Sequence, residues 1–414
     1  MGRAVRSVSE IISTPRQPIC SRLLQPFRRI TSSGDYIGEI DGLRFVAILF
    51  VYLYHLFGDI LKHSPDVYKE PLKTSIFFVL ALNLRIGVQL FFVISGFILA
   101  LPFASHYLSG TRPIQTGKYF LRRLTRLEPP YVLSMLLFFV LKLAAARGSA
   151  SELLPHLAAS LAYLHNAIFG GPSVISIVAW SLEIEIQFYL LAPILATVFL
   201  IRSVAGRRLL LAMACLGFSV ADALWGQNPL LRLSLLGSAQ YFLVGFLLAD
   251  FFVSCGRIRK GDWRWDMAAL AGWPGLAMVL VSQGPWSRLL IPWLALLLYQ
   301  SAFHGVWMNR LFNNLWLTTI GGMCYSIYLL HNYAISILGT YTESIGATAP
   351  VVRRLLLQFS LITPIVLGVC AIYFVLIEKP FMQPDWPQRL AAWMRSRPSS
   401  AVALVTVSES PSAD

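Results

Sequence analysis

Long apolar segments alternate with short polar ones along almost the whole chain. About ten windows are long and apolar enough for membrane-spanning helices; they lie at residues 40–58, 84–103, 130–146, 178–201, 208–226, 235–254, 266–283, 287–304, 312–338 and 355–377. The segment 153–169 is a rival eleventh window. Its histidines, His156 and His165, and the glycines that follow fit a short helix in, or folded back from, the outer surface better than a span.

Composition and charge favour a polytopic, all-α membrane helix bundle. The chain is 56% hydrophobic and only 13% charged, whereas a soluble domain is far more polar. With ten spans, most of the 34 Lys and Arg residues fall in loops on the side of the N-terminus, so both termini are predicted to be cytoplasmic. This topology also explains the net charge of +14 without nucleic acid as a partner.

The apolar pattern indicates three parts. Residues 1–38 form a basic, Arg-rich tail, either cytoplasmic or an organellar transit peptide, residues 39–381 the membrane domain, and residues 382–414 a cytoplasmic tail, partly disordered. The five cysteines lack metal-ligand spacing, and no zinc, nucleotide or dinucleotide motif occurs, so we expect no metal and no permanently bound cofactor.

The first predicted span, residues 40–58, carries charges that need an explanation. Arg44 and His55 are eleven residues apart, so they share one helix face and lie about 16 Å apart along the axis. Asp41 is three residues before Arg44 and is placed to pair with it. Ionisable groups inside a membrane usually mark a site; the alternative is a snorkelling arginine and an interfacial histidine.

Two glutamates follow in the segment 179–193. They point apart, because two residues correspond to about 200° on a helix. Glu185 is predicted at the depth of His55, where a carboxylate beside the imidazole would raise its basicity. The alternative is that Glu183 and Glu185 satisfy structural hydrogen bonds.

A third cluster of candidates is basic. Lys118, Arg122 and Arg126 form a helical stripe with Arg123 at its edge, which predicts either a surface helix on anionic lipid or a site for a phosphorylated substrate. Ser95 is interpreted as a packing residue rather than a nucleophile, and His331 as a second polar wall of a cavity or a satisfied bundle histidine.

Six segments together resemble the acyltransferase 3 family of bacterial membrane acyltransferases, in order and over residues 39–381. They are IDGLRFVAILFVYLYH, GVQLFFVISGFIL, FLRRLTRLEPPY, WSLEIEIQFYLLAP, YSIYLLHN and IEKPF. The resemblance implies ten core spans in the bacterial inner membrane. It also implies transfer of an acyl group, most often acetyl, from cytoplasmic acyl-CoA as co-substrate to a hydroxyl of a glycan, glycolipid or other acceptor.

The resemblance also assigns site residues. Arg44 and His55 correspond to its Arg-x10-His pair, Arg123 and Arg126 to its Arg-x-x-Arg pair, and Glu185 to the glutamate of the motif that begins at Trp180. Two departures are Gln89, where many members have an acid, and Glu128, where an apolar or aromatic residue is usual.

The resulting hypothesis is direct transfer. Arg123 and Arg126, with Arg122, hold the CoA phosphates, Arg44 lines the cavity, and His55 is the general base, with Glu185 and with Asp41, Ser95, Trp180 and His331 in support. The alternatives are a covalent acyl-His55 relay, a transporter or flippase for a glycolipid or polyol, and a non-catalytic assembly partner. The sequence leaves the acceptor, the acyl length and the oligomeric state open.

Overall fold

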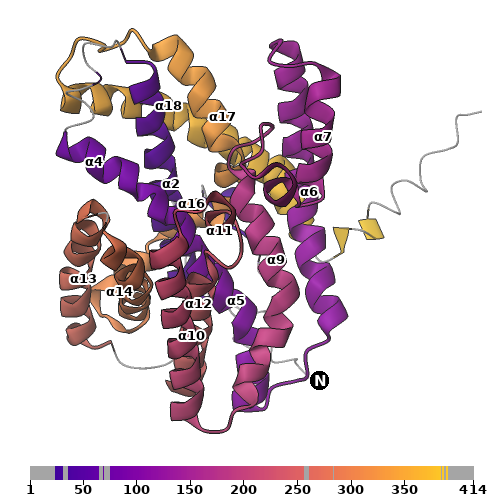
Figure 1. Cartoon of the computed structure of the whole chain (residues 1–414), viewed down its shortest axis with the longest axis vertical. Helices are drawn as coiled ribbons and strands as arrows, with labels where there is room; N and C mark the ends of the chain where they lie inside the picture. Colours follow the sequence, from indigo (N-terminus) through magenta and orange to yellow (C-terminus); the bar gives the residue numbers. More distant parts are fainter. Residues whose placement is uncertain are drawn as a thin grey trace, which may run out of the picture.

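The structure, a computed structural model, is built from helices packed around two central ones (Figure 1). It describes residues 24–30, 36–64, 69, 75–255, 261–282, 284–383, 385–386 and 388–389, and none of these belongs to a β-strand. Most of the tail predicted at 382–414 and much of that predicted at 1–38 lie outside the described residues.

The helices follow one another with short connections. In chain order they are η2 (Gln25–Phe27), α2 (Gly38–Lys62), α4 (Ile76–Asn83), η3 (Leu84–Ile86), α5 (Gly87–Ser109), α6 (Thr116–Ala144), α7 (Ala150–Leu161), α8 (His165–Phe169), α9 (Ala179–Leu195), η4 (Ala196–Leu200), α10 (Val204–Trp225), α11 (Pro229–Arg232), α12 (Ala239–Cys255), α13 (Trp263–Ser282), α14 (Pro285–His304), α15 (Trp307–Phe312), α16 (Leu315–Gly322), α17 (Cys324–Thr342), α18 (Val351–Tyr373), η5 (Phe374–Glu378) and α19 (Lys379–Phe381).

Seven helical stretches among the described residues are long and apolar enough to cross a membrane. They are 38–62, 79–109, 116–144, 179–200, 204–225, 263–282 and 351–381. Each of the ten predicted windows overlaps a helix, but α12 is shorter than a full span. The prediction of an all-helical membrane protein is therefore supported, with seven candidate spans rather than a demonstrated ten.

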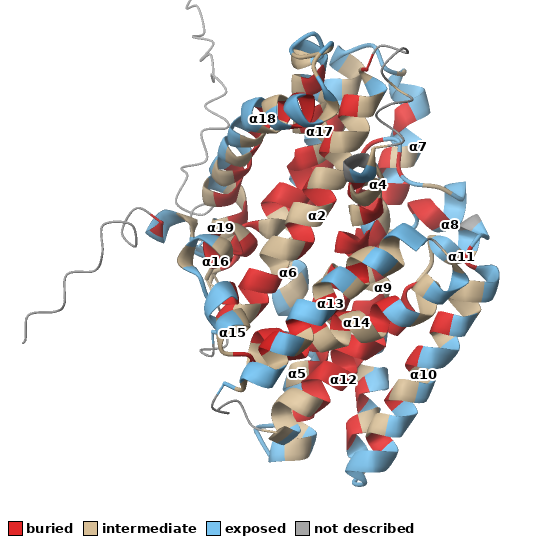
Figure 2. Ribbon diagram, turned by 90° about the vertical axis from the view of Figure 1, so that its left-hand side faces the viewer, coloured by how far each residue is buried: buried red, intermediate tan, exposed pale blue. Residues whose placement is uncertain are grey.

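The centre of the bundle is the pair α5 and α12. Every residue of α12 from 239 to 250 is buried, and Figure 2 shows this helix almost wholly in the colour of buried residues. The two backbones touch, because a Cβ on Gly96 would come within 2.3 Å of the Phe242 carbonyl oxygen. Glycine at this position is what allows α5 to carry the neighbouring Ser95 into the interior.

The outer helices show one buried stripe and one exposed face. In α10 the buried residues recur every four positions, at Arg207, Leu211, Cys215 and Ser219, and Figure 2 shows exposed residues along the rest of the helix. Arg207 and Arg208 both bond the fully buried Asp250 of α12, the second at 2.6 Å. A buried ion cluster thus fixes α10 to the core, because a charge in an apolar interior needs partners.

The segment 115–146 differs from the prediction. A surface helix followed by a short span was expected, but α6 is one continuous 29-residue helix that passes through Pro129 and Pro130. The prolines remove two N–H donors without ending the helix. The basic residues are therefore carried on the same rigid element as the apolar part of α6.

The predicted span 312–338 is also corrected. The structure interrupts it at Met323, between α16 and α17. The segment 153–169 lies in the two short helices α7 and α8, neither of which is a candidate span, as was predicted; its place at the outer surface stays a prediction. In Figure 1, α6 and α7 stand on one side of the bundle and the pair α13 and α14 on the other.

Candidate functional site

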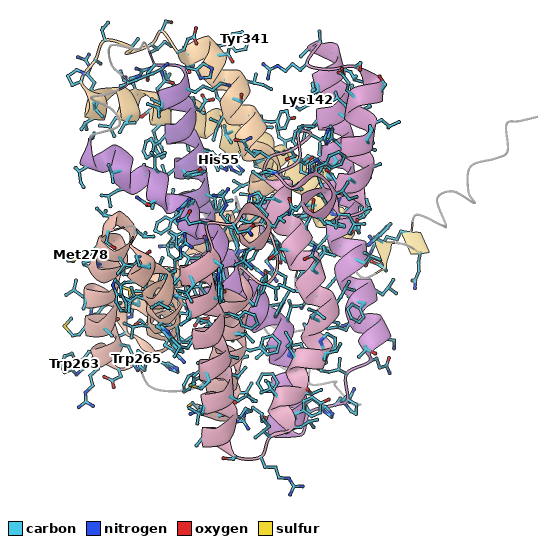
Figure 3. The ribbon with its side chains drawn as sticks, in the orientation of Figure 1. His55, Lys142, Trp263, Trp265, Met278 and Tyr341 are labelled. Carbon is cyan, nitrogen blue, oxygen red and sulfur yellow. The ribbon has the colours of Figure 1, made fainter. Side chains whose placement is uncertain are left out.

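Helix α2 carries two groups of candidate residues on one continuous element. It extends from Gly38 to Lys62, so the eleven residues from Arg44 to His55 correspond to about 16 Å along its axis. Both side chains are partly buried. Figure 3 shows His55 inside the bundle, whereas Trp263 and Met278 lie on the outer edge at α13.

Asp41 is the centre of the charged group at the first end of α2. It is only 1% exposed, and its Oδ1 accepts from Arg29 at 2.9 Å and from Arg44 at 2.6 Å. Tyr36 also hydrogen-bonds this carboxylate, and partial burial together with the Asp41 charge raises the pKa of its hydroxyl, so that it stays a donor. The predicted Asp41–Arg44 pair is confirmed.

Close helix packing holds Asp41 in place. A Cβ on Gly321 of α16 would lie 1.8 Å from the Asp41 carbonyl oxygen, so only glycine lets α16 lie this close to α2. The break between α16 and α17 then brings a second carboxylate to the same region. Glu378, at the end of the π-helical turn η5, accepts from the Ser326 backbone N–H at 3.0 Å and from the Ser326 hydroxyl at 2.5 Å.

Arg126 of α6 joins these two carboxylates. Its guanidinium interacts electrostatically with Glu378 and Asp41 and is repelled by Arg29. We call Arg29, Asp41, Arg44, Arg126 and Glu378 the arginine cluster. Its members come from four separate segments of the chain, since Asp41 and Arg44 share α2.

His55 lies eleven residues after Arg44 on α2, and its ring packs against a second imidazole. The ring centroids of His55 and His331 are 5.0 Å apart, and His331 is fully buried. Its Nδ1 faces the carbonyl oxygens of Ile327 and Tyr328 at 2.8 and 2.9 Å. Carbonyls only accept, so Nδ1 carries the proton and Nε2 of the neutral ring is an acceptor. This Nε2 is buried and finds no partner among the described residues. We call His55 and His331 the histidine pair.

Glu185 does not make the predicted contact with His55. Among the described residues its carboxylate accepts from Ser95 at 2.5 Å and from the Tyr189 hydroxyl, and it interacts electrostatically with Arg123. Tyr328 is near both sides: its ring is 6.0 Å from that of His331, and its hydroxyl, which hydrogen-bonds Ser181 and the Val178 carbonyl, interacts electrostatically with Glu185. Ser95 is thus a hydrogen-bonding residue as well as a packing one.

Glu183 has a structural role instead. It is fully buried, and its two oxygens accept the backbone N–H groups of His165 and Asn166 at 3.1 and 2.8 Å. Burial lowers the pKa of His165, so this ring stays neutral. Trp180 contributes its carbonyl to Asn166 and packs its ring on Phe92. These bonds fasten α8 to α9.

The basic residues of α6 divide between three environments. Lys118 and Arg122 are exposed, Arg123 lies over the rings of Tyr119 and Tyr189, and Arg126 belongs to the arginine cluster. The predicted stripe is therefore not one site. Glu128 hydrogen-bonds Tyr163.

Sequence reasoning missed two members of the arginine cluster. Arg29 was assigned to the tail, and Glu378 belongs to the IEKPF segment but was given no role. A signal for Glu378 was available, because it is an acid at the end of a long apolar window. None of the residues that the structure describes form a group of three metal-ligating side chains, whereas the arginines suit an anion.

Comparison with known proteins gives a family match over most of the chain. A family model described as an acyltransferase domain matches residues 37–376. Among curated proteins, the exopolysaccharide production protein ExoZ of Rhizobium meliloti is 24% identical over 75% of this chain and 93% of its own length.

Two further relatives are named as O-acetyltransferases. A putative O-acetyltransferase of Staphylococcus aureus is 24% identical over 74% of this chain, and the peptidoglycan O-acetyltransferase OatA of Listeria monocytogenes is 28% identical over 47%. The matched regions span 52% and 29% of those two proteins. No solved structure matches the chain.

Proposed function

This chain belongs to the acyltransferase 3 family, and from that premise we propose that it is an integral-membrane O-acyltransferase. It moves an acyl group, most simply acetyl, from cytoplasmic acyl-CoA to a hydroxyl of a glycan or glycolipid. The acceptor class is supported by the names of its relatives, which refer to exopolysaccharide and to peptidoglycan.

The proposed topology has ten spans in the bacterial inner membrane with both termini in the cytoplasm. The overlap of each predicted window with helical structure and the distribution of Lys and Arg support it. The arginine cluster then lies toward the cytoplasm, where acyl-CoA is available, and the histidine pair lies toward the opposite side.

One observation carries the proposed mechanism: α2 is a single helix with Arg44 in the arginine cluster and His55 in the histidine pair. Arg126 and Arg44 bind the phosphates of CoA, for which guanidinium is suited in shape and charge. The pantetheine arm extends along α2 and brings the thioester toward His55. Arg123 acts beside Glu185, and the exposed Arg122 contributes only long-range attraction.

The chemical step is a direct acyl transfer. The acceptor hydroxyl attacks the thioester carbonyl carbon while its proton passes to His55, the carbon–sulfur bond breaks, and the CoA thiolate takes the proton back from His55. His331 accepts a hydrogen bond from the acceptor through its unpartnered Nε2. Glu185 acts through Tyr328 rather than by touching His55.

The test is acyl transfer by the purified protein in vesicles, with labelled acetyl-CoA as donor and a glycan extract of the host as acceptor. Transfer that requires both substrates supports the proposal. Stable label on His55 without acceptor contradicts direct transfer and supports a covalent relay. Mass spectrometry of surface glycans from a deletion strain then identifies the acceptor.

A carrier for a glycolipid or polyol is the second candidate. The break between α16 and α17 favours it, because carriers bind their substrates at interrupted helices. A carrier moves its substrate in the same vesicles without CoA. Translocation that is independent of acetyl-CoA, with no acyl product, contradicts the enzyme proposal.

A further inference from the structure

The segment 24–30 folds back onto the membrane domain close to the arginine cluster. It contains the short helix η2, and Phe27 and Ile30 pack against the hydrophobic core. The Lys379 ammonium donates to the backbone carbonyls of Gln25 and Pro26, at 3.4 and 2.5 Å. The apolar contacts and the hydrogen bonds from Lys379 together hold the segment against the membrane domain.

The segment presents two consecutive arginines in opposite directions. Arg28 is exposed, whereas the Arg29 side chain is only 15% exposed and bonds Asp41 at 2.9 Å. Arg29 precedes residue 37, where the family match begins. The motifs of the family therefore give no indication that this residue reaches the site.

The arginine cluster has more positive than negative charge. Three arginines, Arg29, Arg44 and Arg126, face the two carboxylates of Asp41 and Glu378. Arg29 and Arg126 repel each other. The Nε atoms of Arg29 and Arg126 are both buried, and neither has a hydrogen-bond partner in the part of the chain that the structure describes. Buried guanidinium donors are costly when unpaired, so an anion bound between Arg29 and Arg126 would satisfy donors that the described residues leave free.

We propose that Arg29 is a donor-binding residue, with which the N-terminal segment completes the site for the phosphate groups of acyl-CoA. This inference rests on the proposed function, because acyl-CoA is the polyanion that the enzyme would use. Arg29 and Arg126 take up phosphate from opposite sides, and the Asp41 carboxylate orients Arg29 toward it. Lys379 holds the segment against the membrane domain.

The test compares Arg29→Gln with Arg28→Gln, a neighbouring arginine that is exposed. Both are assayed with acetyl-CoA and with acetyl-pantetheine, which has the same thioester but no phosphate. For Arg29→Gln we expect the KM for acetyl-CoA to rise about tenfold or more, with kcat within about twofold. The KM for acetyl-pantetheine should stay unchanged, Arg28→Gln should behave as wild type, and Arg29→Lys should recover most of the affinity.

Measuring CoA binding to the wild-type protein directly distinguishes a failure of the proposed function from a failure of the role of Arg29. If the wild type does not bind CoA, the proposed function fails and the role of Arg29 fails with it. If the wild type binds CoA and Arg29→Gln binds it equally well, only the role of Arg29 is overturned. A KM that rises equally for both donors overturns it too, because that outcome indicates a structural role. If Arg29→Gln does not fold, Arg29→Ala and Arg29→Met replace it in the test. A folded variant of either kind with wild-type affinity for CoA and full activity also overturns the role of Arg29.

Discussion

The arginine cluster and the histidine pair differ in how they are held together. The cluster gathers charged groups from four segments: Arg29 and Arg44 form ion pairs with Asp41, and Arg126 interacts electrostatically with Asp41 and Glu378. The histidine pair comes from α2 and α17, and it is held by the bonds from His331 to two backbone carbonyls and by ring contacts. One region is built from charge and the other from neutral rings.

This difference has a physical reason. Charges in an apolar bundle need partners, so they are assembled together, and the excess of arginine then attracts an anion. A general base must instead be unprotonated and within reach of the substrate, so that it can take up the substrate's proton. In the proposed mechanism the first region therefore binds the donor and the second performs the chemistry.

The largest effect is expected at the histidine pair. His55→Ala should lower kcat by ~10²- to 10⁴-fold, because it removes the general base, while the affinity for CoA stays at the wild-type value. Steady-state kinetics and CoA binding on the same preparation measure the two quantities. A folded His55→Ala protein with the wild-type rate contradicts the assignment.

Arg126→Gln should change mainly the KM for acetyl-CoA, whereas His55→Ala changes mainly kcat. Loss of a charge-assisted bond to phosphate is expected to raise the KM for acetyl-CoA by about 10- to 100-fold, with a smaller change in kcat. Arg122→Gln, four residues earlier on the same helix and exposed, is the matched control and should change the KM little. Equal effects of the two variants would mean that α6 attracts CoA only by its overall charge.

Glu183 and Glu185 lie two residues apart on α9, and the same change to Gln should have different effects at the two positions. Glu185→Gln should lower kcat about tenfold while the protein remains stable, because the interaction with Tyr328 is weakened. Glu183→Gln should lower the unfolding temperature instead, since its carboxylate accepts two backbone N–H groups of α8. Thermal unfolding in detergent and the assay distinguish them, and reversed signatures would refute both assignments.

The smallest effect is expected at Ser95. Ser95→Ala removes one hydrogen bond to Glu185, so activity should fall about 2- to 10-fold. Complete loss of activity in a stable protein would indicate that Ser95 is a nucleophile, a role that its environment does not support. Initial rates at saturating acetyl-CoA decide between the two.

Much of the site could be predicted from local spacing. The helical repeat predicts that Arg44 and His55 share one face and that Asp41 pairs with Arg44. These predictions need no tertiary information, because all three residues lie on one continuous helix, α2. The assignment of Glu185 to His55 could not be made this way. Matching depth fixes only how far Glu185 lies along the membrane normal. The rotation and lateral position of α9 turned its carboxylate to Ser95 of α5, and Tyr189, one turn further along α9, is its other partner.

The sequence by itself determined that this chain is a helical membrane protein, to which family it belongs, and which residues of α2 are candidates for its chemistry. Apolar length and helical period are local properties, so neighbouring residues are sufficient to define them. Only the tertiary structure brought His331 to His55 and brought Arg29 and Glu378, which are 349 positions apart, to Asp41 and Arg126. Such partners are chosen by helix packing and by the need of buried charges for one another, and neither depends on distance along the chain.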